Sequence, residues 1–191
     1  MNRTCKLSHV TQGYLDVFYS ILNTMIRDMT SVCLTNSISN NFINQMIPHH
    51  EAAIKMSRNI LRYTTNLELQ GIATNIISEQ TKSIANMRAI QSQCSCIINT
   101  DRDLTLYMNR FKEIAETMFN RMGSAPITNN VNINFVREML PHHEGAVQMS
   151  HNALQFNICP PLKPILNAII TSQCAGIRQM QQLLRHLDHC C

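Results

Sequence analysis

Apolar residues recur at helical spacing along most of the chain. In the first stretch they stand three or four residues apart, as one face of a helix requires: Tyr14, Phe18, Ile21, Leu22, Met25 and Met29. A second stretch begins near Ser39 and Asn40, which are good N-cap residues, and continues past Pro48 to about residue 63. A third stretch runs from Leu69 to Met87. The pattern therefore predicts three consecutive helices.

The same pattern returns at an offset of 93 residues, the separation of His49 from His142 (142 − 49 = 93). The register holds without a gap over about residues 14–90 and 107–183. We infer an internal duplication of a three-helix unit. One such unit buries little core alone, so we expect the two to pack as a single all-α helical bundle over residues 1–191, with 93–104 as a short connector.

The composition supports helices and excludes several functions. Hydrophobic residues make up 45% of the 191 residues, and only five Gly and six Pro interrupt them, which favours helices over strands. The net charge of +4 is scattered and forms no basic stripe, so we expect no nucleic-acid partner. No segment reaches the roughly 18 apolar residues of a membrane span.

The eight cysteines take their meaning from the compartment. Asp16 and Asn23 interrupt the apolar part of the N-terminal segment, so we do not interpret it as a signal peptide. A cytoplasmic location is then the default, and thiols stay reduced there. In an exported protein disulfides would be the better interpretation, and the sequence cannot pair them.

Two copies of one motif carry the candidate chemistry: "QMIPHHEAAIKMS" at 45–57 and "EMLPHHEGAVQMS" at 138–150. On a helix Met46 and His49 share a face, and the line continues to Met56. Adjacent His residues point about 100° apart, so one of each pair is expected to face inward and the other sideways or toward solvent. Pro48 either kinks the helix or begins a new one, and Pro141 repeats the choice.

The methionines point to sulfur chemistry at this motif. Five pairs are kept at the offset of 93 residues, whereas Ile47 has become Leu140 and Ile54 has become Val147. A single Met or His on an apolar face is more often packing, but the duplicated pattern favours ligands. Thioether and imidazole together suit a soft ion such as Cu(I). The candidate ligands are Met46, His49, His50, Met56, Met139, His142, His143 and Met149. Further candidates are Met25, Met29, Met87, Met118, Met122 and Met180, with Glu51 and Glu144 as ligands or as groups that orient an imidazole.

A second group of potential ligands stands near the ends of the units. Cys94 and Cys96 close the first unit, and the stretch "RHLDHCC" with His186, His189, Cys190 and Cys191 closes the second. This group is consistent with a thiolate metal site or a relay to the Met–His site. The alternative is a frayed terminus with reactive thiols.

The two motifs, each followed by a stretch of the form "IISEQTKSIANM" or "IITSQCAGIRQM", resemble the bacterial domain-of-unknown-function 305 family over about residues 14–187. The resemblance implies a ferritin-like helical bundle with paired Met-His-His motifs. It also implies a small, often exported protein, with some members tied to copper binding. Glu51 and Glu144 stand here where the family commonly has Gln.

Three functions compete at this stage. The first is a non-enzymatic protein that binds copper, favoured as Cu(I), for storage, buffering or transfer. The second is a di-iron, hemerythrin-like or ferritin-like oxygen or redox protein, which needs several inward carboxylates. The third is a structural bundle without metal, in which the His residues only cap kinks. A metal ion is the expected partner, and a homodimer is left open.

Overall fold

Six α-helices make up the regular structure of the computed structural model, which describes residues 6–188. They are α1 (His9–Thr30), α2 (Ile38–Ile60), α3 (Leu67–Cys94), α4 (Asp101–Gly123), α5 (Val131–Leu154) and α6 (Leu162–Asp188). No strand occurs in this part of the chain. The prediction of an all-α bundle is confirmed. Within residues 6–188 no helix combines the length and the apolar character needed to cross a membrane.

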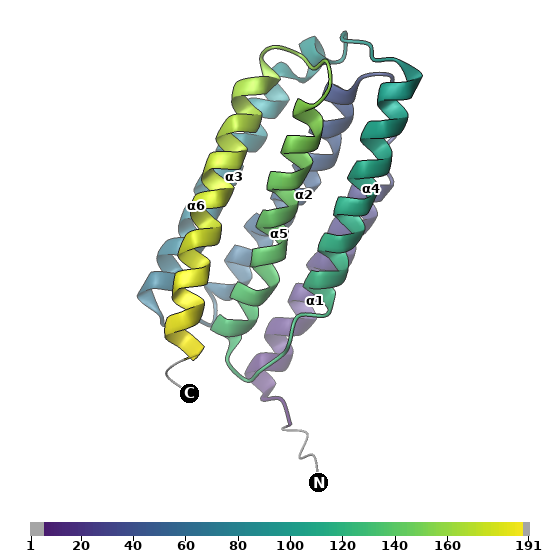
Figure 1. Ribbon diagram of the computed structural model, residues 1–191. Helices are drawn as coiled ribbons and strands as arrows, with labels where there is room; N and C mark the ends of the chain where they lie inside the picture. The colour runs from purple at the N-terminus through teal and green to yellow at the C-terminus, as the bar shows by residue number, and fades with distance from the viewer. Residues whose placement is uncertain (1–5, 189–191) are drawn as a thin grey trace.

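The helices form two layers of three (Figure 1). One layer holds α1, α2 and α3, and the other holds α4, α5 and α6. Across the layers α2 packs against α5 and α3 against α6, with a slighter contact between α1 and α4. The two middle helices, α2 and α5, therefore lie at the centre of the bundle, and they carry the His-His motifs.

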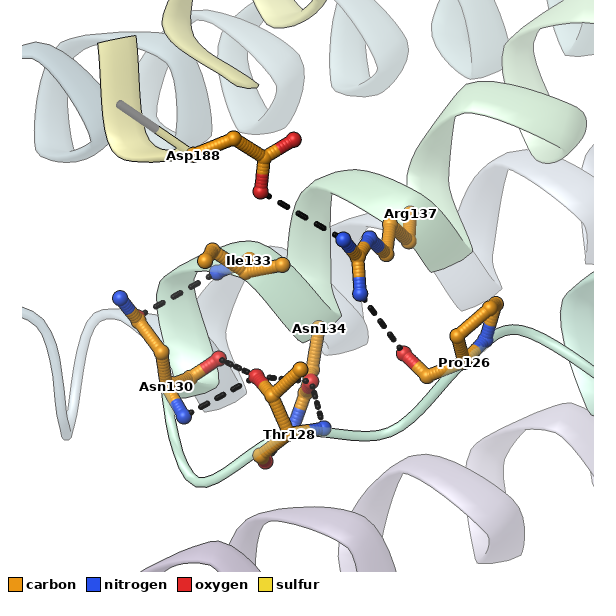
Figure 2. Close-up of polar contacts among 7 residues, drawn as sticks. All are labelled: Pro126, Thr128, Asn130, Ile133, Asn134, Arg137 and Asp188. Carbon is orange, nitrogen blue, oxygen red and sulfur yellow. Dashed lines mark hydrogen bonds and ion pairs between the residues drawn. The ribbon is translucent and has the colours of Figure 1, made fainter. Parts of the chain in front are cut away.

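The loops before α2 and α5 fix the start of each middle helix in the same way. Before α5, the Thr128 backbone N–H donates to Asn134 Oδ1 at 2.9 Å, and Asn134 Nδ2 donates back to the Thr128 carbonyl at 2.8 Å (Figure 2). Before α2, Thr35 and Asn41 form the same two hydrogen bonds at 2.8 and 2.9 Å. Asn and Thr supply such local caps because their short polar side chains reach nearby backbone groups. The two middle helices therefore begin at corresponding residues, Ile38 and Val131, behind the same cap.

Contacts inside the core recur at the offset found in the sequence. Asn59 Nδ2 donates to the carbonyl of Tyr14, and Asn152 Nδ2 donates to the carbonyl of Tyr107, both at 3.0 Å. Between the layers, Tyr14 Oη donates to Glu138, and Tyr107 Oη donates to Gln45. Residues that correspond at the offset of 93 therefore also make corresponding contacts in the structure.

Both motif prolines lie inside continuous helices. Pro48 stands within α2 and Pro141 within α5, so the alternative in which a new helix starts at each proline is wrong. A proline has no backbone N–H, and the carbonyl four residues earlier loses its usual donor. This irregularity falls directly before each His pair.

One disulfide links the two layers. Cys94 at the end of α3 is bonded to Cys159 in the loop before α6, with their Cα atoms 5.2 Å apart. The expectation that the thiols stay reduced is wrong for this pair. Ser37 Oγ donates to the Cys94 carbonyl, and the Cys159 N–H donates to Ser39 Oγ. The bond is therefore built into a buried hydrogen-bonded junction at one end of the bundle.

The remaining potential ligands of the second group do not gather around this disulfide in the described residues. Cys96 is an exposed free thiol, and His186 is exposed on α6. Cys33, which is not part of this group, is also an exposed free thiol. His189, Cys190 and Cys191 lie outside the described residues.

Candidate metal centre

The four tandem histidines are all buried where α2 meets α5. The rings of His49 and His142 stack with their centroids 3.7 Å apart, and both side chains are 0% exposed. The Nε2–H of His142 donates to the carbonyl oxygen of His49 at 3.1 Å. With its proton on Nε2, His142 presents the lone pair of Nδ1. Two imidazoles from opposite layers thus meet at the centre of the bundle.

The second histidine of each pair points sideways within the bundle. His50 Nε2 lies 3.1 Å from Ser83 Oγ on α3, and His143 faces Gly176 on α6. The ring centroids of neighbours in each pair are 5.8 and 5.9 Å apart. This agrees with the expectation of one inward and one sideways ring, but neither sideways ring reaches the protein surface.

Most ring nitrogens of these histidines have no hydrogen-bond partner. Both ring nitrogens of His49 are buried without one, as is Nδ1 of the other three. Such an atom costs about 1–3 kcal/mol when left unsatisfied. A polar atom orphaned in this way indicates a ligand or an unusual strain.

Burial also keeps these imidazoles neutral. It lowers the pKa of His50 and of His143 to about 3, and that of His142 to about 4, while the pKa of His49 lies well below its usual range. The neighbouring imidazoles lower the pKa of His49, His50 and His143 further. Because a metal ion binds the neutral ring, the four side chains are in the ligand-competent state at neutral pH.

Thioethers are buried in the core on all six helices. All ten Met residues of the five sequence pairs are at most 2% exposed. Met46 and Met139 each precede the inward histidine by one helical turn, which places them on the same face. Met118 of α4 reaches α5 at Gly145, one turn after His142, so closely that a Cβ there would collide with its Sδ. Sulfur from a neighbouring helix thus packs against α5 one turn from His142.

The two paired glutamates lie away from this centre. Glu51 forms an ion pair with Arg88 at 2.9 Å, and Glu144 forms one with Arg121. All four side chains in these pairs are partly or largely exposed. The carboxylates are therefore engaged at the outer side of α2 and α5.

A buried carboxyl that the sequence analysis missed lies one turn before His142. Glu138 accepts a hydrogen bond from Tyr14 Oη at 2.5 Å, and burial raises its pKa to about 8, against the effect of that bond. The signal in the sequence was the first letter of each motif, Gln45 in one and Glu138 in the other. In the sequence, Gln at one position and Glu at the other is a difference typical of exposed residues. The structure shows that both side chains are buried.

The donor set fits a soft ion better than a hard one. Within residues 6–188 no three His, Cys, Asp or Glu side chains converge in a way that could hold a metal ion. A metal at the stacked rings would therefore need thioether sulfur besides imidazole nitrogen. Sulfur with neutral nitrogen is the combination that Cu(I) prefers, whereas iron and hard cations prefer carboxylate oxygen.

Comparisons with known proteins agree in fold and family. The chain matches the family model described as "Domain of unknown function (DUF305)" over residues 23–91 and 39–184. Among solved structures it is similar to CopM in three forms. For the Ag-bound form, obtained by soaking, identity is 28%, coverage is 80% of this chain and 98% of CopM, and the TM-score is 0.58. For the Cu(II)-bound form the values are 26%, 78%, 97% and 0.59, and for the Cu(I)-bound form 29%, 78%, 96% and 0.58. Among curated proteins nothing matches.

Proposed function

This chain belongs to the DUF305 family, and we propose that it binds a soft metal ion, Cu(I) in preference, between its two His-His motifs. The observation that carries the proposal is the stacked pair of neutral imidazoles, His49 and His142, buried at the centre with ring nitrogens that lack partners. A bound ion would satisfy nitrogens that the fold otherwise leaves unsatisfied.

We assign the ligands from the helix faces. His49 and His142 would supply nitrogen, and Met46 and Met139 would supply sulfur from one turn earlier on the same helices. Met118 lies within reach of the same region through its contact at Gly145. Because the site holds soft neutral ligands, it would stabilise a monovalent soft cation with little demand for a compensating charge. Such a site serves storage, buffering or transfer, so we propose a non-enzymatic role.

The comparisons support copper in general. CopM, with 26–29% identity to this chain, has been solved with Cu(I), Cu(II) and Ag. Ag(I) is a soft monovalent ion like Cu(I), so a site for both is consistent with sulfur and imidazole ligands. The di-iron alternative receives no such support, because Glu51 and Glu144 are held in outward ion pairs.

The test is an anaerobic Cu(I) titration in competition with a chromogenic chelator. Ascorbate replaces thiol reductants so that the disulfide survives, and the free thiols are alkylated beforehand so that they do not bind the ion. The double variant Met46→Leu, Met139→Leu keeps side-chain volume but removes two sulfurs. We expect its Cu(I) affinity to fall by at least about tenfold, equivalent to about 1.4 kcal/mol.

Two matched controls accompany that variant. Met108→Leu removes a thioether outside the five pairs, at the position that corresponds to Leu15 in the first unit. His151→Gln removes an exposed imidazole of α5. Neither should change Cu(I) affinity, whereas His49→Gln and His142→Gln should each lower it. Equal affinities for all five variants and the native chain would reject the proposed site.

A further inference from the structure

The two sideways histidines have different surroundings, although their motifs match. His50 lines a cavity of about 80 Å³ between α3 and α6, and His143 lines a neighbouring cavity of about 240 Å³ between the same helices. Gln80 and Gln173 line both cavities. The α3–α6 side of the bundle therefore has a smaller cavity at His50, the His50 branch, and a larger, wide cavity at His143, the His143 branch.

A single pair of corresponding residues differs directly beside the two sideways imidazoles. Ser83 on α3 and Gly176 on α6 are related by the repeat offset (176 − 83 = 93). The Ser83 hydroxyl lies 3.1 Å from His50 Nε2. At Gly176 a Cβ would lie 3.0 Å from His143 Cδ2 and 3.1 Å from His143 Nε2. A hydroxyl therefore stands against the His50 ring, whereas no side chain stands in the corresponding place at His143, where His143 and Gly176 both line the wide cavity.

The lining of the cavities mixes apolar and polar side chains, and two buried amides among the polar ones suit a passing cation. Gln80 and Gln173 are 1% and 3% exposed, and both side-chain atoms of Gln80 and Oε1 of Gln173 have no hydrogen-bond partner. Cavities of this size with unpaired polar atoms have room for water, and amide oxygens can replace part of the hydration shell of a cation. Carbonyl oxygens along a path thus lower the cost of leaving bulk water.

The charged side chains favour entry of a cation through the His143 branch. The carboxylate of Glu79 lines both cavities, but Lys82 lines only the cavity next to His50. The His50 branch therefore balances one negative group with one positive group. The His143 branch has Glu79 and no Lys or Arg in its lining, so its potential attracts a cation.

We propose that His143 is the first imidazole to meet an incoming monovalent soft cation, and that Gly176 opens this route while Ser83 closes the equivalent route at His50. The ion then passes inward to the stacked pair of His49 and His142. This inference rests on the proposed metal-binding function and adds a direction to it. The two units would share a ligand set but differ in access.

The test measures the rate of Cu(I) uptake from a chromogenic chelator complex by stopped flow, together with the affinity at equilibrium. Gly176→Ser places a hydroxyl at His143 in the way that Ser83 serves His50. We expect uptake to slow by about fivefold to tenfold, the effect of one added hydrogen bond at the entry ligand, with unchanged stoichiometry. Ser83→Gly should raise the rate by about twofold because a second route opens.

The exchange variant Ser83→Gly, Gly176→Ser tests the route most directly, because it moves the hydroxyl from one sideways histidine to the other. It should restore uptake toward the native rate through His50, and His50→Gln should then slow uptake in this background but not in the native chain. Glu79→Gln should slow native uptake at low salt, whereas the exposed Glu68→Gln on the same helix should not. Melting temperatures show that each variant is folded, and Ser83→Gly tests the route on its own if Gly176→Ser does not fold.

The outcomes separate the two proposals. A native chain that takes up no Cu(I) overturns both. Normal equilibrium binding with an unchanged uptake rate in Gly176→Ser, or in Ser83→Gly, overturns the entry route and leaves the metal site standing. A slow Gly176→Ser variant that the exchange variant does not restore also overturns the route, because blocked access through His143 should be replaceable through His50.

Discussion

The buried carboxyl of Glu138 gives the protein a pH-dependent stability that the substitution Glu138→Gln should remove. Burial raises the pKa of this group from 4.5 to about 8 in the folded chain, while the hydrogen bond from Tyr14 opposes the rise. Between these two values the folded protein keeps a proton that the unfolded chain has lost. The free energy of unfolding therefore falls as the pH rises through this window.

The size of the effect follows from the two pKa values. Their difference is about 3.5, and each pH unit corresponds to about 1.36 kcal/mol, so the carboxyl accounts for about 5 kcal/mol. This stabilisation is fully present below pH 4.5 and is lost by about pH 8. Compared with the 5–15 kcal/mol typical of folded domains, the change is large enough to measure directly.

Glutamine is a suitable replacement because the protein already contains it at the corresponding position. Gln45 is buried, and its Oε1 accepts a hydrogen bond from Tyr107 Oη at 3.0 Å. In the same way the introduced glutamine would accept a hydrogen bond from Tyr14 without titrating. The Glu138→Gln variant should therefore match the native chain near pH 5 and exceed it by several kcal/mol at pH 9.

The assay is urea unfolding of the metal-free protein at pH 5, 7 and 9, with the native chain and the variant compared at each pH. The comparison cancels the other titrating groups. The reverse substitution, Gln45→Glu, adds a second buried carboxyl and should steepen the loss of stability between pH 5 and 9. Identical pH dependence in the native chain and in Glu138→Gln would refute the reasoning, because it would mean that Glu138 is not held neutral.

Three further predictions concern the centre and its supports. Because burial lowers the pKa of His50 and His143 to about 3, that of His142 to about 4 and that of His49 well below its usual range, the metal-free Glu138→Gln variant, which lacks the opposing carboxyl, should lose stability as the pH falls from about 6.5 to about 3, measured by thermal unfolding; a flat profile would contradict it. Gly145→Ala collides with Met118, so it should cost about 1–3 kcal/mol and weaken Cu(I) binding, whereas Ala52→Gly at the corresponding position should cost about 1 kcal/mol without affecting binding. Reducing the Cys94–Cys159 disulfide should lower the free energy of unfolding by about 2–4 kcal/mol, and an unchanged urea midpoint after reduction would show that it adds no stability.

The helices and the orientation of the histidines could be predicted because both depend on local periodicity. The spacing of Tyr14, Phe18, Leu22, Met25 and Met29 marks one buried face of a helix, and all five are buried in α1. The angle of about 100° between neighbouring residues separates the inward from the sideways histidine. Such features need only the geometry of one helix.

The disulfide could not be predicted, because it depends on how the units pack. The repeat offset carries Cys94 to Leu187 (94 + 93 = 187) and Cys159 to Asn66 (159 − 93 = 66), so neither cysteine has a partner in the register. Their approach requires the end of α3 and the loop before α6 to meet at one end of the bundle. Sequence spacing does not contain that information.

The outward direction of the paired glutamates was also beyond the pattern. Glu51 and Glu144 stand beside buried histidines in the sequence, and their repetition favoured a role at the metal. Their helix faces instead meet Arg88 of α3 and Arg121 of α4. A repeated charge can be kept for an ion pair on the surface as readily as for a site, and only the partner helices distinguish the two.

The two units agree where a soft ion would be held and differ around it. The inward histidines and the five Met pairs are the same in both units. Three other positions differ at the offset of 93 residues: Gln45 corresponds to Glu138, Ala52 to Gly145 and Ser83 to Gly176. Each of these differences changes a contact in the core: Glu138 accepts the hydrogen bond of Tyr14, Gly145 packs against the thioether of Met118, and Ser83 lies at the edge of the His50 imidazole. If the repeat served packing alone, the packing residues would have no reason to stay fixed as Met while these neighbours diverged. The proposed site would therefore combine matching ligands from the two units, which could hold one ion between them, with unequal surroundings, which would admit the ion from one side.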